Sequence, residues 1–179
     1  MTGASVAAAM PPAPLLDDAE LALLRYALLP GGRLARLAAT GLSAGEVTDA
    51  DDRACCLVGA ATLVQAGALT AAHQLLTADQ IGLGPIPPRL PSVRRTEALR
   101  LALGGHTAEQ TAAAMDVTEH TVTAYWRARE LGTRSHGQAG YAAIATGLLR
   151  LDSIRCTFPA RTLADYLAGA GQAAPKESA

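Results

Sequence analysis

Residues 106–132, HTAEQTAAAMDVTEHTVTAYWRARELG, decide how the second half of this chain folds. Thr107 and Gln110 form a capping-box pair, which predicts a helix over 108–115. Asp116 stands where the following turn needs a left-handed residue, a conformation that Asp tolerates. Thr118 then caps a second helix, expected over 118–129. The stretch therefore predicts two short helices joined by a tight turn.

The second of these helices has two different faces when it is drawn at about 100° per residue. One side has the bulk to pack on neighbouring helices and holds Val122, Tyr125, Trp126 and Arg129. The other side is short and polar and holds His120, Thr123, Ala124 and Arg127. Such a face can enter the major groove of DNA, where Arg reaches a guanine edge and Thr or Ala contacts a thymine methyl group. An Ala-rich helical hairpin with a polar outer face explains the same residues without DNA, so both interpretations stay open here.

Charge is segregated along the chain, although the formal net charge is only −1. Residues 1–87 hold eight acids against four Arg, whereas residues 88–151 hold eight Arg against five acids. The basic excess coincides with the two-helix stretch, as an electrostatic footprint for DNA phosphates requires. The acidic first half instead suits a surface for a protein partner.

The composition favours an all-α fold. Ala, Leu and Val dominate the hydrophobic residues, and only 3% of the chain is aromatic, which suits packed short helices better than a β-sandwich. Further helices are expected over 16–29, 33–41, 50–66, 69–77, 93–103, 135–150 and 160–169. The predicted segments are a disordered N-terminus (1–14), a helical N-terminal domain (15–80), a Pro/Gly linker (81–91), a helix-turn-helix domain (92–151) and a partly disordered extension (152–179).

The sequence argues against an enzyme. The four His residues do not pair with a nucleophile, and no paired-carboxylate or Cys/His ligand motif appears, so we predict no catalytic residue, no metal and no cofactor. Cys55, Cys56 and Cys156 fit reduced, buried hydrophobic residues. No apolar run approaches the ~20 residues that span a bilayer, and the first residues lack the positive charge of a signal peptide. We therefore expect a cytoplasmic protein without membrane contact.

The stretch SVRRTEALRLALGGHTAEQTAAAMDVTEHTV (92–122), followed by LGTRS (131–135) and AGYAAIATGLL (139–149), resembles the C-terminal DNA-binding domain of LuxR/FixJ-type transcriptional regulators. The resemblance covers about 60 of the 179 residues and spans four helices in order. The matching positions are Glu97, Leu99, Gly105, Thr107, Ala112, Val117, Thr118, Glu119, Thr121, Val122, Leu131, Gly132, Arg134, Ser135, Gly147, Leu148 and Leu149.

The resemblance implies a four-helix domain that binds duplex DNA. Positions that meet bases in the family are matched by Thr123, Ala124 and Arg127. Positions near the DNA backbone are matched by Thr107, Thr118, His120, Thr121 and Tyr125, and we count Arg134 with them. The family's last helix commonly forms the dimer contact, which would here be residues 138–149, so a homodimer is expected.

The chain departs from the family pattern at three places. Thr123 stands where a basic residue is usual, and Tyr125 stands where His is common, so base readout should be weaker or different. The stretch between Tyr125 and Leu131 is about two residues shorter than in the family, which shortens the recognition helix by half a turn and re-aims the last helix.

The first half is too short for a phosphoacceptor receiver domain or an acyl-homoserine-lactone sensor. Two alternatives stay open: a generic helical dimerisation domain, or a degenerate copy of the second half. In the second alternative residues 15–77 match 91–151, each with a Gly-Gly pair, and AGAL (66–69) matches TGLL (146–149).

Taken together, the sequence predicts a transcriptional regulator that binds double-stranded DNA sequence-specifically. Its recognition helix is expected at about 118–129. The alternative is a helical interaction or adaptor protein that uses these units for pairing rather than for DNA readout.

Overall fold

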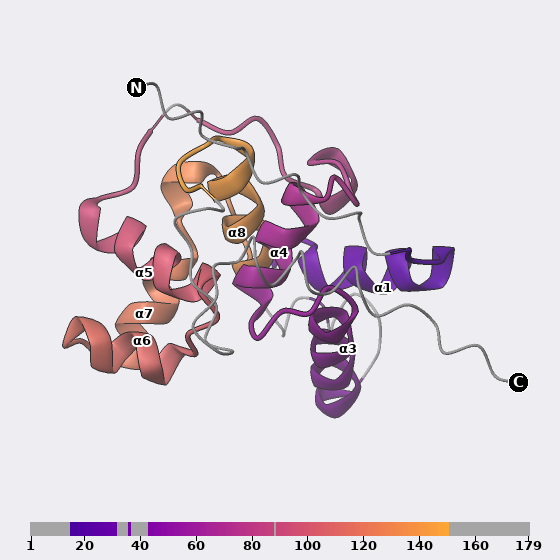
Figure 1. Ribbon diagram of the computed structural model, residues 1–179, viewed down its shortest axis with the longest axis horizontal. Helices are drawn as coiled ribbons and strands as arrows, with labels where there is room; N and C mark the ends of the chain where they lie inside the picture. Colours follow the sequence, from indigo (N-terminus) through magenta and orange to yellow (C-terminus); the bar gives the residue numbers. More distant parts are fainter. Residues whose placement is uncertain (1–14, 32–35, 37–42, 88, 151–179) are drawn as a thin grey trace, which may run out of the picture.

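The computed structural model describes residues 15–31, 36, 43–87 and 89–150, and every regular element within these ranges is helical, so the predicted all-α class is confirmed for them. Figure 1 shows α4 and α8 crossing at the centre, with α1 and α3 on one side and α5, α6 and α7 on the other. The first-half helices are α1 (Asp18–Leu28), α3 (Ala44–Leu57) and α4 (Leu63–Ala72). The second-half helices are α5 (Val93–Leu103), α6 (Ala108–Met115), α7 (Glu119–Trp126) and α8 (His136–Ala145). The helices expected over 33–41 and 160–169, and the termini 1–14 and 152–179, lie outside the described residues.

Side-chain caps fix where the helices of the first half begin. Ser43 accepts a hydrogen bond from Glu46 N, and the Glu46 carboxylate accepts one from Ser43 N, so α3 begins at Ala44 rather than near residue 50. Gly59, at φ 67°, follows its end. The helix expected over 50–66 is therefore wrong, because a capping box at its start was overlooked and the apolar run after it is two helices.

The next helix, α4, is also shifted from its expected position. The Thr62 hydroxyl accepts a hydrogen bond from Gln65 N at 3.2 Å, which starts α4 at Leu63 instead of residue 69. Gln74 adopts φ 55° just past its end. Ala and Leu fill both sides of this junction, so hydrophobic periodicity alone could not place the break.

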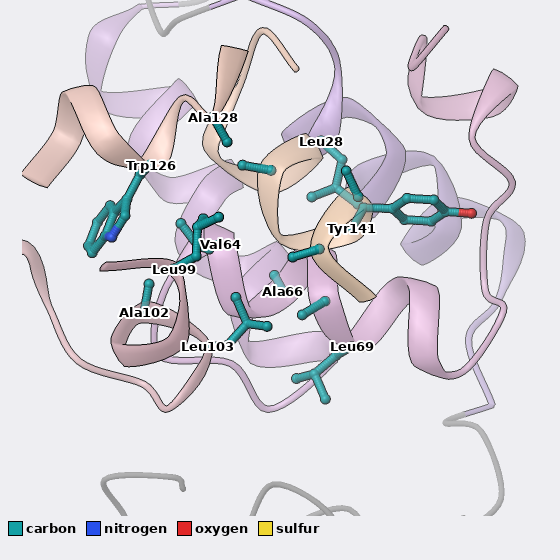
Figure 2. Packing of buried hydrophobic residues seen from close by; sticks show 14 of the residues in the cluster. Leu28, Val64, Ala66, Leu69, Leu99, Ala102, Leu103, Trp126, Ala128 and Tyr141 are labelled. Carbon is teal, nitrogen blue, oxygen red and sulfur yellow. The ribbon is translucent and has the colours of Figure 1, made fainter. Parts of the chain in front are cut away.

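One hydrophobic core joins both halves of the chain. It includes Leu24 and Leu28 of α1, Leu69 of α4, and Leu99 and Leu103 of α5, all fully buried. Figure 2 shows the labelled side chains of α4, α5 and α8 meeting in this cluster. The two halves therefore pack against each other and are not separate domains joined by a flexible linker.

The connector between the halves takes part in that core. Residues 82–87 and 89–92 form no helix, in line with their Gly and Pro content. However, Ile81 and Leu83 are buried, and the Ile81 carbonyl accepts a hydrogen bond of 2.8 Å from Gln138 Nε2 of α8. This fixes the start of the connector against the second half.

The α4–α8 crossing depends on glycine. A Cβ added at Gly67 of α4 would overlap the Gly137 carbonyl, and a Cβ added at Gly140 of α8 would overlap the Val64 carbonyl. Gly67 and Gly140 lie 73 residues apart, as do Val64 and Gly137, so the two contacts are reciprocal. Only residues without a side chain let two helix backbones approach so closely.

The starts of the two crossing helices are also reciprocal. The Ser135 hydroxyl at the start of α8 donates to the Leu28 carbonyl of α1 at 3.2 Å. The Thr62 hydroxyl at the start of α4 donates to the Ala102 carbonyl of α5 at 3.5 Å. Each half thus ties its last helix to the end of the other half's first helix.

These contacts match different segments of the two halves from those that the sequence suggested. AGAL (66–69) lies inside α4, whereas TGLL (146–149) follows α8, so the two are not equivalent. The equivalent segments are Gln65–Gly67 and Gln138–Gly140, both with the sequence QAG. In each, the Gln side chain accepts a hydrogen bond from the backbone N–H four residues earlier, at Ala61 or Arg134.

The α8 helix is shorter than expected and is covered within the chain. It ends at Ala145 rather than at residue 150, because Gly147 follows in the left-handed region at φ 69°. Residues 137–143 are all buried, largely by the crossing with α4. Much of the surface expected to meet a second copy of the chain, 138–149, is therefore occupied by the chain itself.

Candidate nucleic-acid interface

Two caps and one left-handed residue build the α6–turn–α7 unit. The capping box between Thr107 and Gln110 is present, with hydrogen bonds of 2.9 and 3.2 Å, as the sequence predicted. Asp116 adopts φ 52° and ψ 54°, which confirms the expected left-handed turn. Thr118 caps α7 by accepting from Thr121 N at 3.2 Å. The turn angle between the two helices is thus set by local sequence.

Buried side chains hold α7 in place. Val122 is fully buried and Trp126 is only 5% exposed. The indole Nε1 of Trp126 donates to the Ala98 carbonyl of α5 at 3.1 Å, and Figure 2 shows its ring at the edge of the labelled cluster. The predicted packing side of the helix is therefore confirmed for these two residues, while Tyr125 is only half-buried.

The end of α7 differs from the sequence prediction. The helix stops at Trp126, not at 129, and Ala128 turns back at φ 39° into the short 3-10 helix η2 (Arg129–Leu131). The Thr133 hydroxyl donates to the carbonyls of Arg127 and Ala128 and holds this turn. Arg129 was expected on the packing side but is exposed, because it no longer belongs to the helix.

The expected base-contacting residues occupy two different settings. Ala124 is exposed on α7, and Thr123 beside it is half-buried, with its hydroxyl donating to the His120 carbonyl at 2.9 Å. Arg127 is exposed but forms the C-cap, one residue beyond the helix. Two of the three therefore share the helix face, and the third stands at its end.

The expected backbone-contacting residues are also divided. Thr107, Thr118 and His120 are exposed near the starts of α6 and α7, and Thr121 exchanges a 3.0 Å hydrogen bond with Thr118. Arg134 is exposed beyond η2, where it lines a cavity together with Arg127. The Thr hydroxyls serve first as helix caps, a role that leaves an oxygen lone pair or a rotatable proton for a further partner.

Two acids of the second half, Glu97 and Glu130, are paired with arginines. The Arg100 guanidinium donates to Glu97 at 2.8 Å and lowers the pKa of that carboxyl. Arg95 of α5 forms an ion pair with Glu130 of η2. Neither Arg127 nor Arg134 takes part in the ion pairs found among the described residues. The end of α7 therefore keeps exposed positive charge.

His136 packs against Trp126, a contact that the sequence did not predict. Its ring lies edge-on to Trp126, with 5.7 Å between centroids and 84° between planes. Burial lowers its pKa, a hydrogen bond with the Thr123 backbone raises it, and the charges of Arg127 and Arg36 lower it. The only available signal was its place directly after the capping residue Ser135. The first residue of α8 thus supports the end of α7.

Within the described part of the chain, no group of three His, Cys, Asp or Glu residues is placed to hold a metal ion, and no helix is long and apolar enough to cross a membrane. Cys55 is half-buried, and burial raises its pKa to about 12. Cys56 is exposed, so the expectation that it is buried is wrong.

The chain was also compared with known proteins. Comparison with protein-family models, with curated proteins and with solved structures finds no match.

Proposed function

We propose that this chain is a transcriptional regulator that binds double-stranded DNA sequence-specifically, with α7 as its recognition helix. The observation that carries the proposal is the division of α7 into a buried and an exposed side. Val122 and Trp126 anchor the helix, while Ala124 presents a short side chain to solvent. A helix that is firmly held and has short outward side chains can approach base edges in the major groove.

The proposed reading surface consists of Thr123 and Ala124 on the helix and Arg127 at its end, while His120 stands near the expected path of the phosphates. Ala124 and the Thr123 methyl group suit thymine methyl groups, and the Arg127 guanidinium suits a guanine edge. Thr107, Thr118, Thr121 and Tyr125 supply hydroxyls near the expected path of the phosphates, and Arg134 supplies charge. This arrangement resembles the LuxR-type unit in its two caps and left-handed turn, and differs from it in the short α7.

The pairing of α4 with α8 changes the expected mode of binding. A LuxR-type domain commonly uses its last helix to meet a second copy, but here α8 is buried against α4 of the same chain. We propose that the first half acts as an in-chain partner, so that one chain carries one reading helix. A homodimer on DNA would then need a different surface.

The test is a titration of the full chain against a selected DNA duplex, followed by fluorescence anisotropy. Ala124→Glu places a negative charge on the proposed reading face without disturbing the core, because Ala124 is exposed. We expect specific binding to weaken by about tenfold or more, since a carboxylate there faces base acceptors and phosphates. The matched control is Ala22→Glu, the same change at an exposed position of α1.

Equal affinities of the two variants for the selected duplex would contradict the assignment of α7. The second candidate function is a helical interaction or adaptor protein. It is favoured by the acidic outer side of α3, where Glu46, Asp49 and Asp52 are exposed. DNA binding that shows no sequence preference and survives only at very low salt would support this second candidate.

A further inference from the structure

A cavity of about 790 Å³ opens between the two halves of the molecule, beside the end of α7. We call it the junction cavity. The second half contributes Arg127, Arg129, Arg134 and His136 to its lining, and the first half contributes Arg36 and Asp51. Three of these arginines stand within eight residues of one another, because the early end of α7 and the turn of η2 fold that segment around the cavity.

The carboxylates near the cavity are already engaged. Asp51 accepts two hydrogen bonds from the Arg36 guanidinium, one of them 2.7 Å between Nη2 and Oδ2. Arg36 also lies over the Tyr26 ring, 5.5 Å from its centroid. Glu130, next to Arg129 in sequence, pairs with Arg95 of α5. Charges of opposite sign therefore cancel at Arg36, while three other guanidinium groups line the cavity.

Those three groups are exposed and enter no ion pair among the described residues. Arg127, Arg129 and Arg134 all have exposed side chains, and the ion pairs of the described ranges involve other residues. A planar guanidinium binds phosphate through two parallel hydrogen bonds, and several around one concavity favour a polyanion. The cavity therefore offers about three positive charges to an entering group.

Size and lining further restrict the ligand. Pockets of about 300–1,000 Å³ are typical of small-molecule sites, and the junction cavity falls within this range. Ala27 and Leu63 supply apolar wall on the first-half side. A ligand with a phosphorylated end and a less polar body fits this combination. The convex surface of a DNA duplex fits a concave site between two packed halves less well.

We propose that the junction cavity binds a phosphorylated small molecule of about nucleotide size, held by Arg127, Arg129 and Arg134. Because Arg127 is also a proposed base contact, the ligand and a specific DNA duplex compete for it, and each weakens the binding of the other by the same factor. The coupling to DNA rests on the proposed function, whereas binding of the phosphorylated ligand does not.

The experiment measures binding of ATP to the full chain by equilibrium dialysis, with inorganic pyrophosphate as a second probe and adenosine as the uncharged control. Fluorescence of Trp126 is recorded in parallel, because it is the only Trp of the chain and its ring contacts His136 of the cavity. We expect saturable binding of ATP, a change in Trp126 emission, and no binding of adenosine. Arg129→Gln should weaken ATP binding about tenfold, the effect of losing one charge-assisted hydrogen-bonding group.

The matched control is Arg94→Gln, which removes another exposed Arg, on α5, that does not line the cavity. If Arg94→Gln weakens ATP binding as much as Arg129→Gln does, the attraction is diffuse and the proposal is overturned. The absence of saturable ATP and pyrophosphate binding would overturn it as well.

A DNA arm separates this proposal from the proposed function. A duplex with the selected sequence should displace ATP, while a scrambled duplex should displace it much less. Equal displacement by both duplexes would mean that the cavity takes DNA phosphates, and would overturn the small-molecule proposal. ATP binding by a chain that shows no specific DNA binding would leave the cavity assignment standing and refute the proposed function.

Discussion

The α3 and α7 helices correspond to one another in the two halves, yet their exposed sides carry opposite character. Ser43 and Thr118 cap them, and Val47 and Val122, each four residues after its cap, are both fully buried. Each helix packs against the first helix of its own half, α1 or α5. The buried positions agree because packing restricts them, whereas the exposed positions are free to differ.

The exposed positions differ in charge. Asp49 and Asp52 of α3 correspond to Ala124 and Arg127 of the second half, each pair 75 residues apart. In our proposal, the second half presents a surface that suits DNA, whereas the exposed side of α3 is acidic. Two helices with the same cap and buried position can thus present different surfaces, since their exposed residues contribute little to the stability of the fold.

The two helices also end differently. α3 continues for 14 residues, whereas α7 has 8 and is followed by the left-handed Ala128. The early end turns Arg127, Arg129 and Arg134 toward the first half, where they line the junction cavity. The left-handed Ala128 changes the direction of the chain after α7. This one residue therefore accounts for the basic lining that the second half gives to the cavity, whereas the first half has a continuous helix.

The largest loss of stability is expected when one of the two corresponding buried valines, Val47 or Val122, is replaced by a charged residue. Val122→Asp places an unpaired charge in the core and should cost about 4–5 kcal/mol, a large part of the stability of a domain this size. We expect most of the helical signal in circular dichroism to be lost. Val47 is fully buried as well, although it lies outside the core cluster that joins the two halves. Val47→Asp should therefore destabilise the first half, and the shared core should make the unfolding of both halves cooperative.

Two results would break the comparison. Full helicity of Val122→Asp would refute the packing of α7, and separate melting of the halves in Val47→Asp would refute cooperative unfolding. Ala124→Asp, an exposed change two residues further along α7, serves as the control and should stay within about 1 kcal/mol of the parent.

An intermediate effect is expected at the reciprocal α4–α8 crossing. Gly67→Ala and Gly140→Ala each force a methyl group onto a backbone carbonyl of the other helix, which should cost about 1–3 kcal/mol or more. Urea denaturation measures the loss. Gly84→Ala is the matched control, since a Cβ there meets no atom within 4 Å.

Reciprocity makes this test stringent. Because Gly67 and Gly140 occupy equivalent places, their two losses should be similar. A neutral effect at either position would mean that the halves do not approach as closely as the contacts indicate.

The smallest effect concerns His136, which corresponds to Leu63 of the first half. Burial, and to a smaller extent the charges of Arg127 and Arg36, lower the pKa of His136, although its hydrogen bond with the Thr123 backbone opposes this. The unfolded state therefore binds the proton more readily than the folded state. Stability should be fully present above the unfolded pKa of about 6.5 and should fall as the pH drops through the folded pKa.

His136→Leu tests this by copying the residue of the first half. Its urea midpoint should fall less than that of the parent chain as the pH is lowered from about 7.5 to 5. A decline remains from His73, whose pKa is also lowered by burial. Identical pH profiles for the parent and His136→Leu would remove His136 as a contributor.

Several features of the fold could be predicted from the sequence because they depend on neighbouring residues. The capping box at Thr107, the left-handed Asp116 and the buried side of α7 at Val122 and Trp126 were all predicted correctly. Each depends on hydrogen bonds or periodicity within about four residues. The start of α3 was equally readable from Ser43 and Glu46, although periodicity over the apolar run pointed elsewhere.

The candidate site was only partly predictable for the same reason. Ala124 and His120 are exposed on α7 as expected, because the helical repeat places them there. The positions of Arg127, Arg129 and Arg134 depend on the left-handed conformation of Ala128. Ala rarely adopts this conformation, and the local sequence does not predict it.

The sequence by itself determined the helical class, the caps and the anchored side of α7, since these follow from interactions along one segment of chain. The tertiary structure alone decided that α8 pairs with α4, that the connector enters the core at Ile81, and that basic residues meet Arg36 in one cavity. Those outcomes join residues that lie tens of positions apart. The pairing of α8 with α4 arises because Gly67 and Gly140 let two helices touch, a fit that only both backbones together can specify.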